Sequence, residues 1–240
     1  MKSIATFILV IIGITFTQAQ REKKIKGDGN IVSLERKIGD FGGIAVGGFY
    51  QVALVDGEEG TVTLKGEANL LEYIETEVKS GTLIIKAKKN VQLRPSRGET
   101  IYVTIPVDKI DAIRLSGSGK VVGKKTFEAS NFKIHTSGSK NADLRVNAKN
   151  VMIITSGAST ITLGGTSESL EITSSGSSNL SAYEFTTDTA EISSSGSSNI
   201  RITVNESIDS RSSGSSNTKY RGNPDVIHSK SSGSSRVSKQ

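Results

Sequence analysis

The second half of the chain repeats one alternation of apolar and polar positions, centred on a Ser-Gly-Ser-like turn. Apolar side chains occupy most of the fourth and sixth positions before each turn glycine, and a mostly polar position separates them. The same alternation resumes four and six positions after the glycine. Apolar residues at every second position are typical of a β-strand with one buried face. Each copy therefore predicts two short strands joined by a tight turn.

The turn recurs at nearly constant intervals of 18 to 21 residues, which a disordered serine-rich linker has no reason to keep. The turn glycines are Gly117, Gly138, Gly157, Gly176, Gly196, Gly214 and Gly233. One copy cannot bury its apolar face alone, whereas stacked copies bury their faces in one continuous core. The repeat thus predicts an all-β fold, a right-handed parallel β-helix (β-solenoid) with rungs of roughly 19 residues.

The first half of the chain shows other patterns. Residues 1–19 join a basic start to an apolar run and a small-residue end, the arrangement of a secretory signal peptide. Residues 20–110 contain strand-like segments without a constant period, so they form either irregular rungs or a small sheet capping the solenoid. Residues 111–240 form the regular solenoid. No later stretch is long and apolar enough to span a membrane, so we expect secretion across the inner membrane to the periplasm or cell surface.

Composition narrows the possible functions. The chain has no cysteine, no tryptophan and only 5% aromatic residues, which excludes disulfides and thiolate metal sites and disfavours base-stacking platforms. Its formal net charge of +6 is mild and sits largely in short runs typical of solvated faces. The two histidines, His135 and His228, lie far apart in the repeat order. We therefore expect no nucleic-acid partner, no cofactor, no metal and no catalytic residue.

Three carboxylates share one place in the repeat, five positions before the turn glycine. They are Glu171, Glu191 and Asp209. Stacking places them on consecutive rungs of one outer face, where like charges raise one another's pKa or recruit a cation. This acidic ladder supports an alternative function, a polysaccharide lyase or hydrolase. Arg211 and Lys230 share the same face, and they favour the competing interpretation that cations neutralise the acids.

Four asparagines share a second place, three positions after the turn glycine. They are Asn141, Asn179, Asn199 and Asn217. We expect them to form an amide ladder along one edge of the solenoid. Stacked amides stabilise β-architectures by bonding to one another, and they equally offer repeated donors and acceptors to a glycan. The sequence leaves both interpretations open.

The order of motifs resembles a known family. The segments are Phe41–Ile44, Asn69–Leu71, Gly81–Ile85 and Ile110–Gly119, followed by the repeated Ser-Gly-Ser-Ser-Asn turns. Together they resemble the putative auto-transporter adhesin, head GIN domain family over nearly all of the chain after residue 19. This resemblance implies a secreted, β-helical protein of the cell envelope. We accordingly expect a non-catalytic solenoid that either binds an extracellular glycan or envelope protein or serves as a structural module; self-association is left open.

Overall fold

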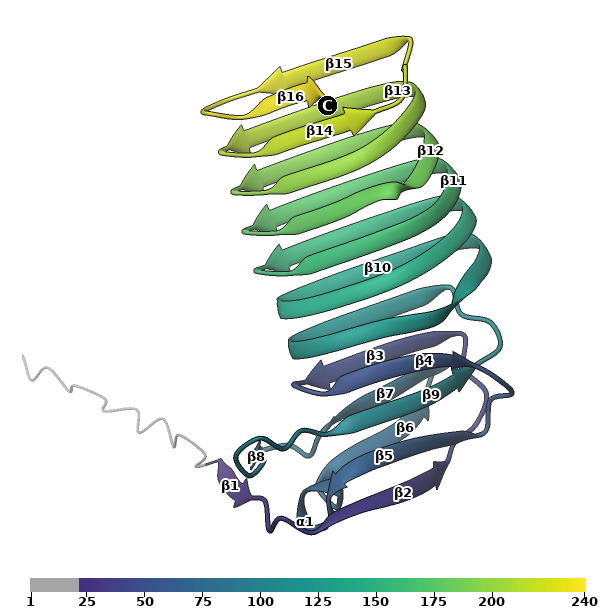
Figure 1. Ribbon diagram of the computed structural model, residues 1–240, viewed down its shortest axis with the longest axis vertical. Coiled ribbons are helices and arrows are strands. Elements are labelled where there is room, and N and C mark those ends of the chain that lie inside the picture. Colours follow the sequence, from purple (N-terminus) through teal and green to yellow (C-terminus); the bar gives the residue numbers. More distant parts are fainter. Residues whose placement is uncertain (1–21) are drawn as a thin grey trace, which may run out of the picture.

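The computed structural model describes residues 22–240, so the predicted signal peptide lies outside the described residues. The described chain is a β-solenoid of about five turns with rungs of about 19 residues, which confirms the predicted fold class (Figure 1). Its regular rungs pair in parallel with the rungs before and after them. The long strands are β10 (Ala112–Gly157), β11 (Thr160–Gly176), β12 (Asn179–Gly196) and β13 (Asn199–Gly214). The chain ends with β14 (Asn217–Arg221) and β15 (Val226–Ser231), which both pair with β13, and with β16 (Arg236–Lys239), which pairs with β14.

The turn glycines form a column along one edge. Gly176 pairs with Gly196, and Gly196 pairs with Gly214. The φ angle at Gly196 is +94°, a conformation that side chains rarely adopt. A Cβ atom at this position would also lie 2.5 Å from the carbonyl oxygen of Gly176. Glycine is therefore required twice over, by the backbone conformation and by the close approach of the neighbouring rung.

The core is a set of apolar columns inside the rungs. Ile153, Ile172 and Ile192 occupy the same place in three successive rungs and are each at most 1% exposed. Because strands in a sheet lie about 4.8 Å apart, each isoleucine packs directly on the next. Burial of these stacked side chains removes apolar surface from water, the main favourable contribution to folding.

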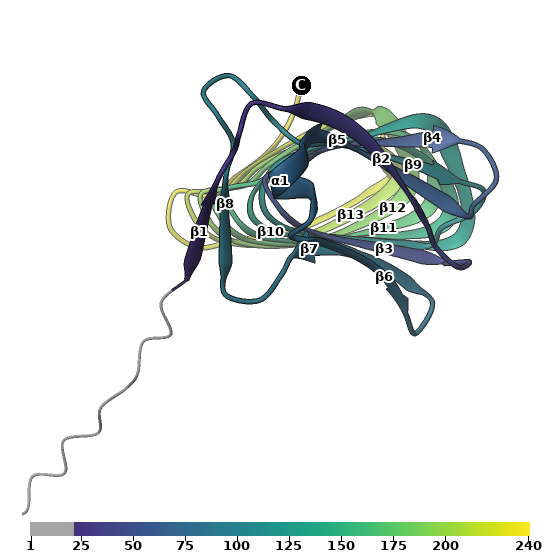
Figure 2. The same cartoon turned by 90° about the horizontal axis from the view of Figure 1, so that it is seen from below.

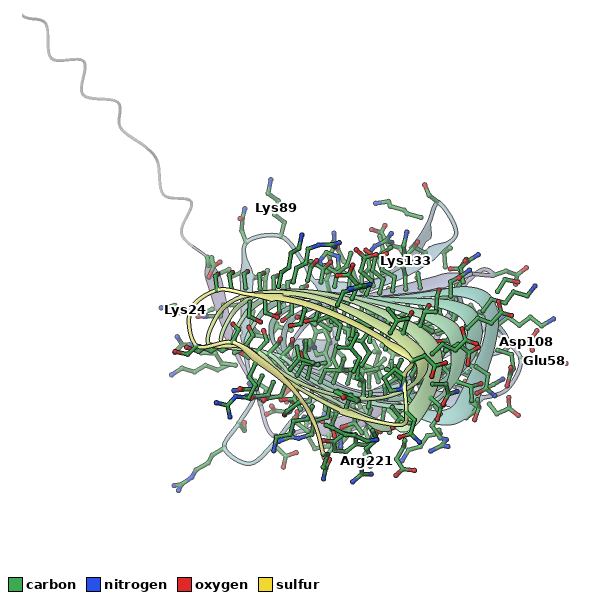
Figure 3. All side chains as sticks on the ribbon, turned by 90° about the horizontal axis from the view of Figure 1, so that it is seen from above. Lys24, Glu58, Lys89, Asp108, Lys133 and Arg221 are labelled. Carbon is green, nitrogen blue, oxygen red and sulfur yellow. The ribbon has the colours of Figure 1, made fainter. Side chains whose placement is uncertain are left out.

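Outward side chains fall on two broad faces. The pre-turn face contains the outward positions one, three and five before each turn glycine, and the post-turn face contains those three, five and seven after it. Lys133, on the pre-turn face, and Arg221, on the post-turn face, project from opposite sides of the flattened solenoid (Figure 3). The start of each of the strands β11 to β13 therefore builds the post-turn face, and its end builds the pre-turn face.

The first half of the chain contains both irregular rungs and a capping sheet. Parallel pairing continues through β3 (Gly43–Gly48) and β4 (Gln51–Asp56), which lie against β10, and through β7 (Thr82–Ala87) and β9 (Tyr102–Val107). Beyond them the pairing becomes antiparallel. The antiparallel strands are β2 (Ile31–Lys37), β5 (Thr61–Glu67) and β6 (Ile74–Lys79). A solenoid end needs such a change, because its last apolar face has no further rung to cover it.

A short helix and a separate strand pair complete this end (Figure 2). Helix α1 (Ala68–Leu71) buries Leu70 and Leu71 against the end of the core. Strand β1 (Lys23–Lys26) pairs in parallel with β8 (Val91–Arg94). These elements close the solenoid with side chains that belong to no repeat.

A buried carboxylate fastens the loops at this end. Glu67 accepts hydrogen bonds from the backbone N–H groups of Gly29 at 2.8 Å and Ser96 at 2.9 Å, and from the Ser96 hydroxyl at 2.5 Å. Burial raises the pKa of Glu67, but the bonds from Ser96 and Gly29 outweigh this and hold the pKa below its usual value. The ionised carboxylate thus ties two loops, far apart in sequence, to the end of β5.

We predict that Gly196→Ala destabilises the solenoid by about 2 kcal/mol, because alanine strains the left-handed turn and its Cβ atom meets the Gly176 carbonyl. Urea unfolding followed by circular dichroism measures the loss. Ser197→Ala is the matched control, since Ser197 is exposed in the same turn. Equal stability of the two variants would contradict the requirement for glycine.

Candidate functional site

A groove of about 480 Å³ runs across the last rungs of the pre-turn face. One wall is the column three positions before the turn glycines, and the other is the column directly before them. The residues of the first column are Thr173, Ser193, Arg211 and Lys230, and those of the second are Ser175, Ser195, Ser213 and Ser232. Each rung thus adds hydroxyl or cationic groups at intervals of about 4.8 Å. The volume lies in the range of ligand-binding clefts, about 300–1,000 Å³.

The acidic ladder borders this groove. Glu171, Glu191 and Asp209 follow one another in register on three rungs. Arg211 lies against two of them: its Nη1 donates to Oε1 of Glu191 at 3.0 Å, and its Nη2 donates to Oδ2 of Asp209 at 3.0 Å. No group of three or more His, Cys, Asp or Glu residues between 22 and 240 is arranged to hold a metal ion. The geometry favours the interpretation in which Arg211 neutralises the acids.

The amide column lies on the post-turn face. Asn179, Asn199 and Asn217 are in register, and Asn199 Nδ2 donates to Asn179 Oδ1 at 3.2 Å. Asn141 stands apart, because Thr160 occupies the rung between it and Asn179. The structure therefore brings together three of the four asparagines. The bond between Asn199 and Asn179 uses part of the hydrogen-bonding capacity that a ligand would need.

A second polar ladder was missed in the sequence. Asn150 Nδ2 donates to Asn131 Oδ1 at 2.9 Å, and the Ser169 hydroxyl donates to Asn150 Oδ1 at 2.7 Å. All three residues lie seven positions before their turn glycines. The same counting rule that predicted the other ladder would have found this one.

The inward serines near the turns bond to one another. The hydroxyl oxygens of Ser174 and Ser178 are 2.5 Å apart, those of Ser174 and Ser198 are 2.7 Å apart, and Ser194 donates to Ser212 at 3.0 Å. These side chains are buried. Each buried hydroxyl in these bonds has a partner, as buried polar groups generally require. These bonded serines stabilise the stack, and Ser174, Ser194 and Ser212 also line the groove. The buried hydroxyl of Ser216 has no partner among residues 22–240.

Lys140 interrupts this pattern. It lies two positions after its turn glycine, where later rungs carry Ser159, Ser178 and Ser198. Its side chain is fully buried, and its Nζ has no hydrogen-bond partner among residues 22–240. Burial lowers the pKa of Lys140 to about 8. Below that pH the native state holds an uncompensated buried charge.

We predict that Lys140→Met stabilises the protein by about 3 kcal/mol at neutral pH, because the native pKa lies well below the ordinary lysine value of about 10.4. The unfolded chain binds a proton up to that higher value. The stability of the wild-type chain relative to the variant should therefore rise as the pH increases from about 8 to 10.4. Urea unfolding across this range measures the difference. Lys149→Met, at an exposed lysine, should show neither effect; a similar pH response in both variants would contradict the assignment to Lys140.

Comparison with known proteins finds one matching family model and several solved structures with a similar fold. The family model described as "Putative auto-transporter adhesin, head GIN domain" matches residues 40–224. A putative adhesin from Bacteroides fragilis superposes with a TM-score of 0.80 at 24% identity, covering 90% of this chain and 100% of that one. A putative lipid binding protein from Parabacteroides distasonis gives 0.73 at 23% identity, with 91% and 100% covered.

A putative adhesin from Parabacteroides distasonis gives a TM-score of 0.69 at 16% identity, again covering 91% of this chain and 100% of the other. At these identities the structural likeness establishes the fold. A search of curated proteins returns no match. Within residues 22–240, no helix has the length and apolar character needed to cross a membrane.

Proposed function

Since this chain belongs to the putative auto-transporter adhesin, head GIN domain family, we propose that it is a non-catalytic, adhesin-like binding module located outside the cytoplasm, at the cell envelope. Its ligand is an extended glycan that lies in the groove of the pre-turn face. The family match confirms the resemblance found in the sequence and supports adhesion as the general role. The groove supports the choice of surface.

The repetition of hydroxyl groups along the groove carries this proposal. Ser175, Ser195 and Ser213 stand at the same place on successive rungs, so a ligand lying along the solenoid axis meets the same donor and acceptor at every step. Repeated surfaces of this kind suit extended polymers. A glycan presents hydroxyl groups in just such a series.

The charges beside the groove favour a neutral glycan. Arg211 and Lys230 supply two positive charges, and Glu171, Glu191 and Asp209 supply three negative ones, so the net charge beside the groove is small. Arg211 is held by Glu191 and Asp209, so its orientation is set before a ligand arrives. Its remaining N–H groups and the carboxylate oxygens offer donors and acceptors side by side. Such a pairing suits sugar hydroxyls, which both donate and accept hydrogen bonds.

We predict that the purified chain binds a neutral polysaccharide on an array containing xylan, mannan and β-glucan, and that Ser193→Tyr weakens this binding about tenfold. Ser193 lies in the wall of the groove, and a tyrosine there would fill it. Ser181→Tyr places the same side chain on the post-turn face of the same strand, β12, and should leave binding unchanged.

Three results would overturn the proposal. They are the absence of binding to every neutral polysaccharide on the array, equal binding by Ser193→Tyr and the wild type, and equal loss in the two tyrosine variants. Asn199→Ala tests the amide column separately. If the column is structural, as the Asn199–Asn179 bond favours, this variant should lose stability and keep its affinity for the glycan.

A further inference from the structure

The post-turn face carries a group of cations near the end of the chain. Arg201, Lys219, Arg221 and Arg236, called the basic cluster here, are exposed on β13, β14 and β16. Lys219 lies beside Arg201 in register, and Arg236 lies beside Asn217. Neighbouring rungs are about 4.8 Å apart, so positive charges are held close together on one flat surface.

No carboxylate within residues 22–240 lies close enough to pair with these charges. Within the part of the chain that the structure describes, no member of the basic cluster makes an ion pair. The outward positions three, five and seven after the glycines, from Gly157 onward, include no acidic residue. Glu184, next to Tyr183 on β12, makes no ion pair with the cluster. Like charges side by side on neighbouring strands are destabilising, and here nothing in the fold relieves the repulsion.

On the pre-turn face, by contrast, an arginine does form ion pairs. There Arg211 contacts Glu191 and Asp209, each at 3.0 Å. Arg211 is therefore paired on the pre-turn face, whereas the basic cluster on the post-turn face makes no ion pair. An external anion would remove the repulsion within the basic cluster, and binding would gain the free energy that the repulsion costs.

Part of the cluster is held in place before any ligand arrives. The guanidinium carbon of Arg221 lies 4.0 Å from the centroid of the Tyr183 ring, a cation–π contact. This contact holds Arg221 at the surface. A guanidinium group recognises carboxylate or sulfate oxygens through two parallel N–H donors. Asn199 and Asn217 lie beside the cluster and add amide groups suited to sugar hydroxyls.

We propose that the basic cluster binds a linear anionic polysaccharide, whose sulfate or carboxylate groups recur along the polymer. The flat face and the cations on successive rungs suit an extended polyanion. A lipid bilayer is disfavoured because the cluster contains no large apolar side chain to insert. The exposed Val226 and Ile227 lie on β15, in the strand of the last rung that continues the pre-turn side. This site is distinct from the groove on the pre-turn face.

The test compares two double variants of the full chain that lose the same charge. Arg201→Ser with Lys219→Ser removes the centre of the basic cluster, whereas Lys133→Ser with Lys149→Ser removes two exposed lysines outside it. Binding to heparin, which is sulfated, and to alginate, which is carboxylated, is measured by titration calorimetry, with dextran as the neutral polymer. Circular dichroism melting confirms that both variants fold.

We expect the wild-type chain to bind heparin or alginate with an affinity that falls as salt is added, whereas any binding of dextran should be independent of salt and unchanged in the cluster variant. The cluster variant should lose at least about tenfold in affinity, and the control less than about twofold. Equal losses in both variants would show attraction to net charge alone and overturn the proposal. Full affinity in the cluster variant, or no binding of either polyanion by the wild type, would overturn it too.

Two further probes separate other occupants. Binding to phosphatidylglycerol vesicles without binding to heparin or alginate would assign the cluster to a membrane surface and reject the polysaccharide. Tighter binding of single-stranded DNA than of both polysaccharides would also reject it. The Ser193→Tyr variant should bind the polyanions normally. Failure of the groove to bind neutral glycans would therefore leave this test unaffected.

Discussion

Backbone pairing between successive rungs is the constraint on which the whole structure depends. Each rung hydrogen-bonds to the next in parallel and in register, so a residue type that recurs every 18 to 21 positions becomes a column about 4.8 Å in spacing. The glycine column maintains this register at the turn edge. A Cβ atom at Gly196 would lie 2.5 Å from the carbonyl oxygen of Gly176, so any other residue there would push the two rungs apart. Core packing and surface chemistry both follow from this one spacing.

The columns explain which parts of the structure the sequence could predict. The alternation of inward and outward positions along a strand is enough to place Ile172 inside and Glu171 outside. The number of residues between each of them and the turn glycine then assigns it to its column. The fold class and the stacking of Glu171, Glu191 and Asp209 followed from that count. The same count places Thr160 between Asn141 and Asn179, so the interruption of the amide column was visible in the sequence.

Other features could not be derived this way, because they depend on segments without a period. The antiparallel strands at the first end of the solenoid pair residues far apart in sequence, such as Leu34 with Leu64. Nothing in local patterning indicates that Glu67 is buried with two loops around it. The basic cluster was missed for another reason. Total charge was weighed along the chain, whereas the relevant quantity is charge per column, and Arg201 and Lys219 share one column.

A solenoid of this kind keeps its surface chemistry separate from its stability. An outward position contacts only its neighbours in the same column and on the same face, so a substitution at Arg201 leaves the isoleucine core untouched. The two faces are built by opposite ends of the long strands, as Arg201 and Arg211 on β13 show. Arg211 can therefore sit between two carboxylates on one side while Arg201 and Lys219 remain unpaired on the other. One backbone thus carries two surfaces of different charge.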